Sequence, residues 1–175
     1  MRAVQIWKAA VEDTVDFLDK LIGLLRSHQI RFCVIGGQGV NAYAEPLISL
    51  DLDLVVAAHQ IKEVEGLLED HFEVQRFPHS LNISAPGSNL RVQIQTDPRY
   101  FAFTDRAASR DVLGIDLPVA RIEDVLQGKV WAATDSTRRP SKRRKDLLDI
   151  ERLIESHAEL RQLVSAEILG KFSEK

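Results

Sequence analysis

The sequence predicts a protein of the mixed α/β (α+β) class, in which a small mixed β-sheet is flanked by helices. Short apolar runs alternate with amphipathic stretches between about residues 30 and 118, whereas residues 121–170 have only helical patterns. The chain has 175 residues, 45% of them hydrophobic, which suits one domain with a proper core. We therefore expect a single domain over 1–175, with a sheet core at about 30–118 and C-terminal helices at about 121–170.

The first part of the chain alternates helix and strand. Between about residues 4 and 28, apolar residues recur at three- and four-residue steps, among them Leu18, Leu21, Ile22 and Leu25. A core strand, "RFCVIG", comes next, and the glycine pair Gly36 and Gly37 leads into a helix of about two turns before Pro46. The segment "LDLDLVV" at 50–56 is then the second strand.

The remaining elements follow from periodicity and turn signals. A helix is expected over 59–72, and "SLNIS" and "NLRVQIQ" flank the turn signal "APGS", which indicates a hairpin. The expected strands are 73–77, 80–84, 89–95 and extended segments near 112–119, with irregular or helical structure before residue 109. The expected last helices cover 121–134, 146–157 and about 158–170.

Composition limits the environment and the chemistry. The net charge is −3, and the chain has no long apolar run and no signal-like start, so we expect a cytoplasmic protein without a membrane segment. Cys33 is the only cysteine and lies in an apolar run, which predicts a buried reduced thiol. The five histidines have no metal-ligand spacing, so the sequence does not predict a zinc site.

Asp51 and Asp53 are the residues that most need a functional explanation. Side chains two apart on a strand share a face, so the leucines point one way and the two aspartates the other. Like charges on one face repel, and aspartate is rare in strands. Two such carboxylates can hold Mg²⁺, which also binds substrate phosphates. Since Gly36 and Gly37 precede them by about fifteen residues and suit a phosphate-binding turn, the pattern predicts a nucleoside-triphosphate (NTP) site.

These segments carry a family resemblance. "VIGGQGVNAYAEPLISLDLDLVV", at 34–56, resembles the signature of the minimal nucleotidyltransferases of the DNA polymerase β-like superfamily. "LPVARIEDVLQGKVWAATDSTRRPSKRRKDLLDIERLIE", at 117–155, is similar to the C-terminal part of the bacterial branch related to abortive-infection (AbiEii-like) toxins. The resemblance implies a nucleotidyltransferase fold and transfer of a nucleoside monophosphate from an NTP to an acceptor hydroxyl of RNA, protein or a small molecule.

The same resemblance implies roles for particular residues. Asp51 and Asp53 would be catalytic and would hold Mg²⁺ or Mn²⁺. The nucleotide-binding residues would be Gly36, Gly37, Gln38, Lys129, Lys145, Asp146 and Asp149. A partner protein of a toxin–antitoxin pair is a second implied partner, and the sequence leaves a homo-oligomer open.

The third carboxylate of the family pattern is missing from its expected strand. In "NLRVQIQTD" the positions predicted to face the site are Arg91, Gln93 and Gln95. An amide cannot act as a general base. Asp97 is in phase with Gln95 and would replace the acid only if the strand continued that far. The alternative is therefore a catalytically degenerate protein that binds nucleotides or forms one half of a toxin–antitoxin pair.

Several C-terminal residues have two interpretations. Lys129 lies within an apolar helical stripe, so it either extends past the core to solvent or reaches into a cleft. Asp146 and Asp149 are also typical of an acidic helix start. The basic run "RRPSKRRK" at 138–145 is either a solvated loop or a surface for a phosphate-rich partner such as tRNA. "GQGVNA" at 37–42 fits a loose dinucleotide-binding fingerprint, but the chain lacks the further βαβ units of that fold.

Overall fold

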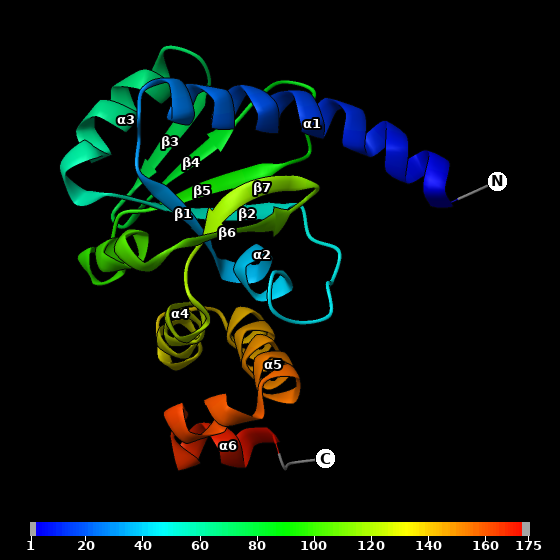
Figure 1. Ribbon diagram of the computed structural model, residues 1–175, viewed down its shortest axis with the longest axis vertical. Coiled ribbons are helices and arrows are strands. Elements are labelled where there is room, and N and C mark those ends of the chain that lie inside the picture. The colour runs from blue at the N-terminus through cyan, green and yellow to red at the C-terminus, as the bar shows by residue number, and fades with distance from the viewer. Residues whose placement is uncertain (1–2, 173–175) are drawn as a thin grey trace. The chain divides into compact units, whose positions relative to one another are not determined.

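The computed structural model describes residues 3–172, with side chains from residue 15 onward (Figure 1). It divides into two compact units that we describe separately. Unit 1 comprises Met1–Cys33 and Ser49–Asp105, and unit 2 comprises Val34–Ile48 and Arg106–Lys175. The expectation of a single domain stays a prediction.

Unit 1 contains a mixed sheet in the order β3-β4-β5-β2. Strand β2 (Asp51–Val56) runs parallel to β5 (Arg91–Gln95), and β5 pairs antiparallel with β4 (Ser80–Ser84). Strand β3 (Glu73–Phe77) is antiparallel to β4. The hairpin predicted at the "APGS" turn is therefore confirmed.

One face of this sheet is apolar because side chains alternate along each strand. Leu52, Leu54, Val92 and Ile94 are at most 1% exposed. Helices α1 (Ala3–Ser27) and α3 (Ile61–Glu69) lie on the same side of these strands (Figure 1). The ring of Phe17 in α1 packs edge-on against Phe72 just after α3, with centroids 5.1 Å apart. The unit also contains short 3-10 helices, η1 (Ala58–Gln60) and η2 (Pro98–Arg106), the latter reaching the unit boundary.

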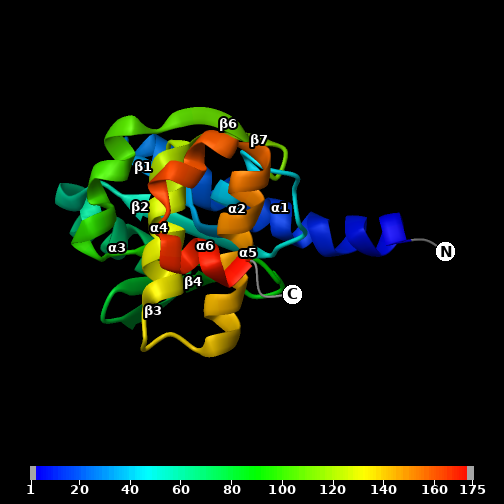
Figure 2. The ribbon, with the colours of Figure 1, turned by 90° about the horizontal axis from the view of Figure 1, so that it is seen from below.

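Unit 2 combines three strands with a helical layer. Strand β1 (Phe32–Ile35) enters it at Val34, which pairs in parallel with Val119 of β7 (Ile115–Val119). Strand β6 (Ala108–Val112) is antiparallel to β7. Helix α2 (Gly36–Asn41) follows β1 directly. Helices α4 (Ile122–Thr134) and α5 (Pro140–Ser156) pack side by side, as Figures 1 and 2 show, and η3 (Ala158–Leu163) and α6 (Ala166–Phe172) follow.

The mixed α/β class is confirmed, and three element boundaries need correction. Helix α5 begins at Pro140, six residues before the predicted start, because a proline suits the first helical position and the residues after it are good helix formers. Residues 140–145 are therefore helix and not loop. Helix α2 ends at Asn41, well before Pro46. The predicted closing helix is divided into η3 and α6. Within the described residues, no helix is long and apolar enough to cross a membrane.

Candidate functional site

The two aspartates of β2 lie on the face of the unit 1 sheet opposite the apolar core. Asp51 and Asp53 are half-buried, whereas Leu52 and Leu54, which alternate with them along β2, are fully buried. The backbone N–H of Asp51 donates to Ser49 Oγ at 3.2 Å, which fixes the start of the strand. The fold therefore places two carboxylates next to each other on a polar sheet surface.

The parallel pairing of β2 with β5 decides what faces these carboxylates. In the register, Asp51 is opposite Arg91 and Asp53 is opposite Gln93. Arg91 Nε lies 2.7 Å from Asp51 Oδ1, so a cation already contacts this carboxylate. Beyond Gln93, the same row continues with Asn82 of β4. The two positions directly opposite the aspartates therefore hold a guanidinium and an amide, and neither is an acid.

Asp97 could serve as a third carboxylate only if strand β5 continued to residue 97, and it does not. Strand β5 ends at Gln95, which is opposite Val55, and the N–H of Asp97 donates to Gln95 Oε1 at 3.0 Å. The Asp97 carboxylate accepts bonds from Arg99 Nε at 3.0 Å and Nη2 at 2.8 Å. This side-chain pairing with Arg99 lowers the pKa of Asp97. Asp97 is thus held in a local turn past the end of the strand.

The donor set at β2 fits one divalent ion that is completed by a ligand. Within the described residues, no group of three or more His, Cys, Asp or Glu side chains could hold a metal. Mg²⁺ is commonly bound by one or two carboxylates together with substrate phosphates, so a pair suffices for such a site. The Asp51 carboxylate is paired with the Arg91 guanidinium, which an ion bound there would displace. Asp51 and Asp53 are therefore the residues that could hold Mg²⁺ or Mn²⁺.

The glycine turn belongs to unit 2. Gly36 has a φ of 65°, a left-handed conformation that a side chain would strain. A Cβ at Gly37 would meet nothing within 4 Å, whereas one at Gly39 would lie 3.3 Å from Val125 Cγ2. Gly39, which sequence reasoning assigned only to a fingerprint, thus allows α2 to pack on α4. Gln38 is buried, and its Oε1 accepts a bond from Asn41 Nδ2 at 3.3 Å.

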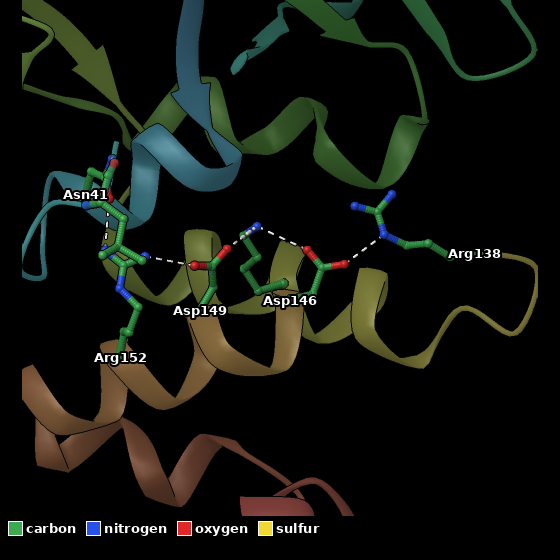
Figure 3. A network of polar contacts seen from close by, with 7 residues as sticks. Asn41, Arg138, Asp146, Asp149 and Arg152 are labelled. Atoms are coloured by element: carbon green, nitrogen blue, oxygen red, sulfur yellow. Dashed lines mark hydrogen bonds and ion pairs between the residues drawn. The ribbon is translucent and has the colours of Figure 1, made fainter. Parts of the chain in front are cut away.

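In unit 2, Lys129 contacts two other predicted nucleotide-binding residues, Asp146 and Asp149, both labelled in Figure 3. Lys129 Nζ of α4 lies 3.1 Å from Asp146 Oδ1 and 2.7 Å from Asp149 Oδ2, both on α5. The three side chains are at most 9% exposed. Lys129 does not extend past the core to solvent, because its ammonium group is buried between two carboxylates, and its predicted place in a cleft stays a prediction. Asp146 and Asp149 lie inside α5 and do not start it.

Two arginines extend this row of charges in both directions. Arg138 Nε lies 2.7 Å from Asp146 Oδ2, and Arg152 Nη1 lies 2.8 Å from Asp149 Oδ1. Arg152 Nη2 also donates to Asn41 Oδ1 at 2.9 Å and to the carbonyl of Glu45 at 2.6 Å. Signs alternate along the row, so each buried charge has opposite neighbours, as burial requires. The network joins α4 and α5, and through Asn41 it reaches the end of α2 (Figure 3).

The other cations of the basic run at 138–145 do not form ion pairs with Asp146 or Asp149. Arg139, Arg144 and Lys145 are exposed, and Lys142 and Arg143 are half-buried. Within the described residues, none of these five forms an ion pair, since the nearest acids along α5 point to Lys129 and the two arginines. The run therefore leaves a cationic surface at the start of α5.

Sequence reasoning missed four partners. Arg91 was expected to face the site but had no role, and its pairing with Asp51 depends on strand register. Arg138 was read only as part of the basic run. Arg152 follows Asp149 by three residues, a helical spacing that could have signalled the pair. Asn41 gave no signal, because 111 residues separate it from Arg152.

The fold is that of a nucleotidyltransferase. The antibiotic-resistance factor ANT(2″)-Ia superimposes with a TM-score of 0.63 at 12% identity, covering 93% of this chain and 94% of that chain. A crystal structure of ANT(2″)-Ia in complex with adenylyl-2″-tobramycin gives a TM-score of 0.62 at 12% identity, over 92% and 99% of the two chains. The lincosamide antibiotic adenylyltransferase LnuA gives 0.52 at 15% identity, over 78% and 95%.

Family membership follows from the sequence itself. Residues 52–175 match the family model "Nucleotidyl transferase AbiEii toxin, Type IV TA system". The chain therefore belongs to the AbiEii nucleotidyltransferase toxin family, and the predicted resemblance is confirmed. A comparison with curated proteins found no match.

Proposed function

We propose that this protein binds a Mg²⁺–NTP complex through Asp51 and Asp53 and transfers a nucleoside monophosphate to an acceptor oxygen. The observation that carries the proposal is the pair of half-buried carboxylates, Asp51 and Asp53, on one face of β2. Mg²⁺ bound there would neutralise triphosphate charge and polarise the α-phosphate. Membership of a toxin–antitoxin family supports a partner protein as well.

The remaining candidate residues have weaker support. The left-handed backbone at Gly36 and the open space at Gly37 favour the glycine turn as a phosphate-binding element. Lys129, Asp146 and Asp149 satisfy one another's charges, so their role in nucleotide binding stays a prediction. Lys145 is exposed and stays a prediction too.

Nucleotide binding is tested by thermal unfolding with Mg²⁺ and ATP, GTP, CTP or UTP. A ligand at about 100 times its Kd adds about 2.7 kcal/mol to the free energy of unfolding. For a chain of this size that corresponds to a rise in Tm of roughly 5–10 °C. No shift with any of the four nucleotides would contradict the proposal.

Asp53→Asn separates the metal site from the rest of the protein. The amide keeps the shape of the side chain but loses the charge, so the Mg²⁺-dependent part of the Tm shift should disappear while the protein stays folded. Asp70→Asn is the matched control, because Asp70 is exposed after α3 in the same unit. Equal shifts in Asp53→Asn and the parent protein would remove Asp53 from the metal site.

A second candidate is nucleotide binding without transfer. It is favoured by Gln93 opposite Asp53, since an amide there cannot take the proton of an attacking hydroxyl. Incubation with α-labelled NTPs and RNA, protein or small acceptors discriminates the two candidates. A Tm shift without transferred label supports this second candidate, and label on an acceptor supports the first.

A third candidate is RNA binding by the cationic surface at the start of α5. The observation that favours it is the absence of ion pairs within the described residues for five cations of the run, Arg139, Lys142, Arg143, Arg144 and Lys145. Acidic side chains are absent from the first turn of α5, although a helix N-terminus normally favours them. A phosphate-rich ligand would supply the missing negative charge.

A further inference from the structure

Arg91 is the side chain that a metal ion at Asp51 would have to displace. Its Nε lies 2.7 Å from Asp51 Oδ1, and its backbone N–H donates to the carbonyl of Leu50 at 2.8 Å. The pairing of β2 with β5 keeps the two residues opposite each other. A divalent cation and this guanidinium therefore compete for the same carboxylate.

The ion pair between Arg91 and Asp51 contributes little to the stability of the fold, so stability alone does not explain an arginine at this position. The Arg91 side chain is 75% exposed and that of Asp51 30% exposed. Ion pairs with this exposure add little to stability, because water and salt screen them. What the guanidinium does locally is to offset one of two adjacent negative charges on β2.

The two terminal NH₂ groups of Arg91 are available to bind a second partner. The pair with Asp51 uses Nε, and within the described residues Arg91 forms no other ion pair. Its two terminal NH₂ groups are the forked donors that suit phosphate oxygens. An ion at Asp51 would both release the guanidinium and bring phosphates next to it.

We propose that Arg91 is the resident counter-ion of Asp51 in the nucleotide-free protein and a triphosphate-binding residue once Mg²⁺–NTP is bound. This inference rests on the proposed function, because it places the metal at Asp51. Its consequence is that free divalent ions bind poorly, and that metal and nucleotide bind together. Arg91 would thereby make the site bind the Mg²⁺–NTP complex in preference to the free metal ion.

The test uses Mn²⁺ as the probe, measured by electron paramagnetic resonance without nucleotide. Arg91→Gln removes the competing charge, so Mn²⁺ should bind roughly three- to ten-fold more tightly than to the parent protein. The same variant should bind Mg²⁺–ATP about ten-fold more weakly, since charge-assisted bonds to phosphate are lost. The loss should be smaller for AMP, which lacks the outer phosphates.

Two further variants make the result specific. Arg91→Lys keeps the charge and should leave Mn²⁺ binding near that of the parent. Arg76→Gln removes a charge from the same unit, where Arg76 pairs with Glu65 and Glu69 of α3, and should change neither affinity.

Opposite changes in the two affinities support the inference, because a residue with a purely structural role would not tighten metal binding. Unchanged or weaker Mn²⁺ binding in Arg91→Gln overturns the counter-ion role, and unchanged ATP binding overturns the triphosphate role. If the parent protein, Arg91→Gln and Asp53→Asn all fail to bind either Mn²⁺ or Mg²⁺–ATP, the proposed function itself fails.

Discussion

Gln93 is the residue on which the proposed chemistry of Asp51 and Asp53 depends. It lies opposite Asp53, and the row continues through Asn82 of β4 to Gln75 of β3. A carboxylate at this position would add a metal ligand and a base, whereas the amide adds neither charge nor a proton acceptor of useful strength. The row therefore suits binding of polar groups more directly than proton removal.

Gln93→Glu is expected to strengthen metal binding and weaken the metal-free fold. A glutamate opposite Asp53 places like charges on neighbouring strands, which should lower the free energy of unfolding by up to about 1 kcal/mol. The extra carboxylate should tighten Mn²⁺ binding roughly ten-fold. Denaturant unfolding and Mn²⁺ titration measure the two effects.

Gln75→Glu is the matched control for this change, since Gln75 is the exposed end of the same row. It should leave Mn²⁺ affinity unchanged. If Gln93→Glu also leaves the affinity unchanged, position 93 does not face the ion.

Asp97 gives a pH-dependent contribution to stability. Arg99 holds the pKa of its carboxyl below the ordinary value of 3.8, so the ionised form is favoured in the folded protein. A depressed folded pKa stabilises the fold above the unfolded pKa, and this contribution is lost as the pH falls through the folded value. Asp97→Asn should therefore be less stable than the parent at pH 7, and the difference should shrink below about pH 3.8. Urea unfolding at several pH values measures it, and a pH-independent difference would contradict the assignment.

At the scale of elements, a buried network of charges connects α4, α5 and the end of α2. Lys129 joins the two long helices through Asp146 and Asp149. Arg152 then carries the connection from Asp149 to Asn41. Leaving a charge of such a network without its partner is costly because water cannot replace the partner.

Lys129→Ala should lower the free energy of unfolding by about 1–3 kcal/mol, because two buried carboxylates lose their shared cation while Arg138 and Arg152 still pair with them. Lys129→Met retains the apolar stem, so a loss that persists in that variant reports the charge and not the packing. Chemical denaturation measures both.

Lys142→Ala is the control for the Lys129 variants. Lys142 lies on α5 and forms no ion pair within the described residues, so its change should stay within about 0.5 kcal/mol. Similar losses for Lys129→Ala and Lys142→Ala would contradict a structural role of the network.

Over the whole chain, local sequence patterns predicted the order of helices and strands. They did not predict which residues far apart in the sequence contact each other. The alternation in "LDLDLVV" was enough to put Asp51 and Asp53 on the polar face of β2. The partner of Asp51 depends on the register between β2 and β5, which no local pattern contains. Likewise, Lys129 could be placed on an apolar helix face, but its acids lie on another helix. The start of α5 was missed because a run of cations resembles a loop, although Pro140 marks the first turn.

The distribution of charge along the molecule leads to the last prediction, which concerns polyanions. Five cations of the run 138–145 have no acidic partner within the described residues, whereas Arg138 pairs with Asp146. Neutralising five phosphates gives a slope of about −3.5 to −4.5 for log K against log salt. The affinity for tRNA should then fall roughly 130- to 500-fold between 50 and 200 mM salt.

Charge-removing variants attribute this salt dependence to the surface of α5. Replacing Lys142, Arg144 and Lys145 by glutamine should reduce the slope to about −1.4 to −1.8, since two contacts remain. Asp53→Asn should leave the slope as it is, because its carboxylate is part of the proposed metal site and not of the cationic surface. Fluorescence anisotropy with labelled tRNA measures both. A slope that the triple variant does not change would show that RNA, if bound, is held by other residues, and would leave the cations of α5 as a solvated helix face.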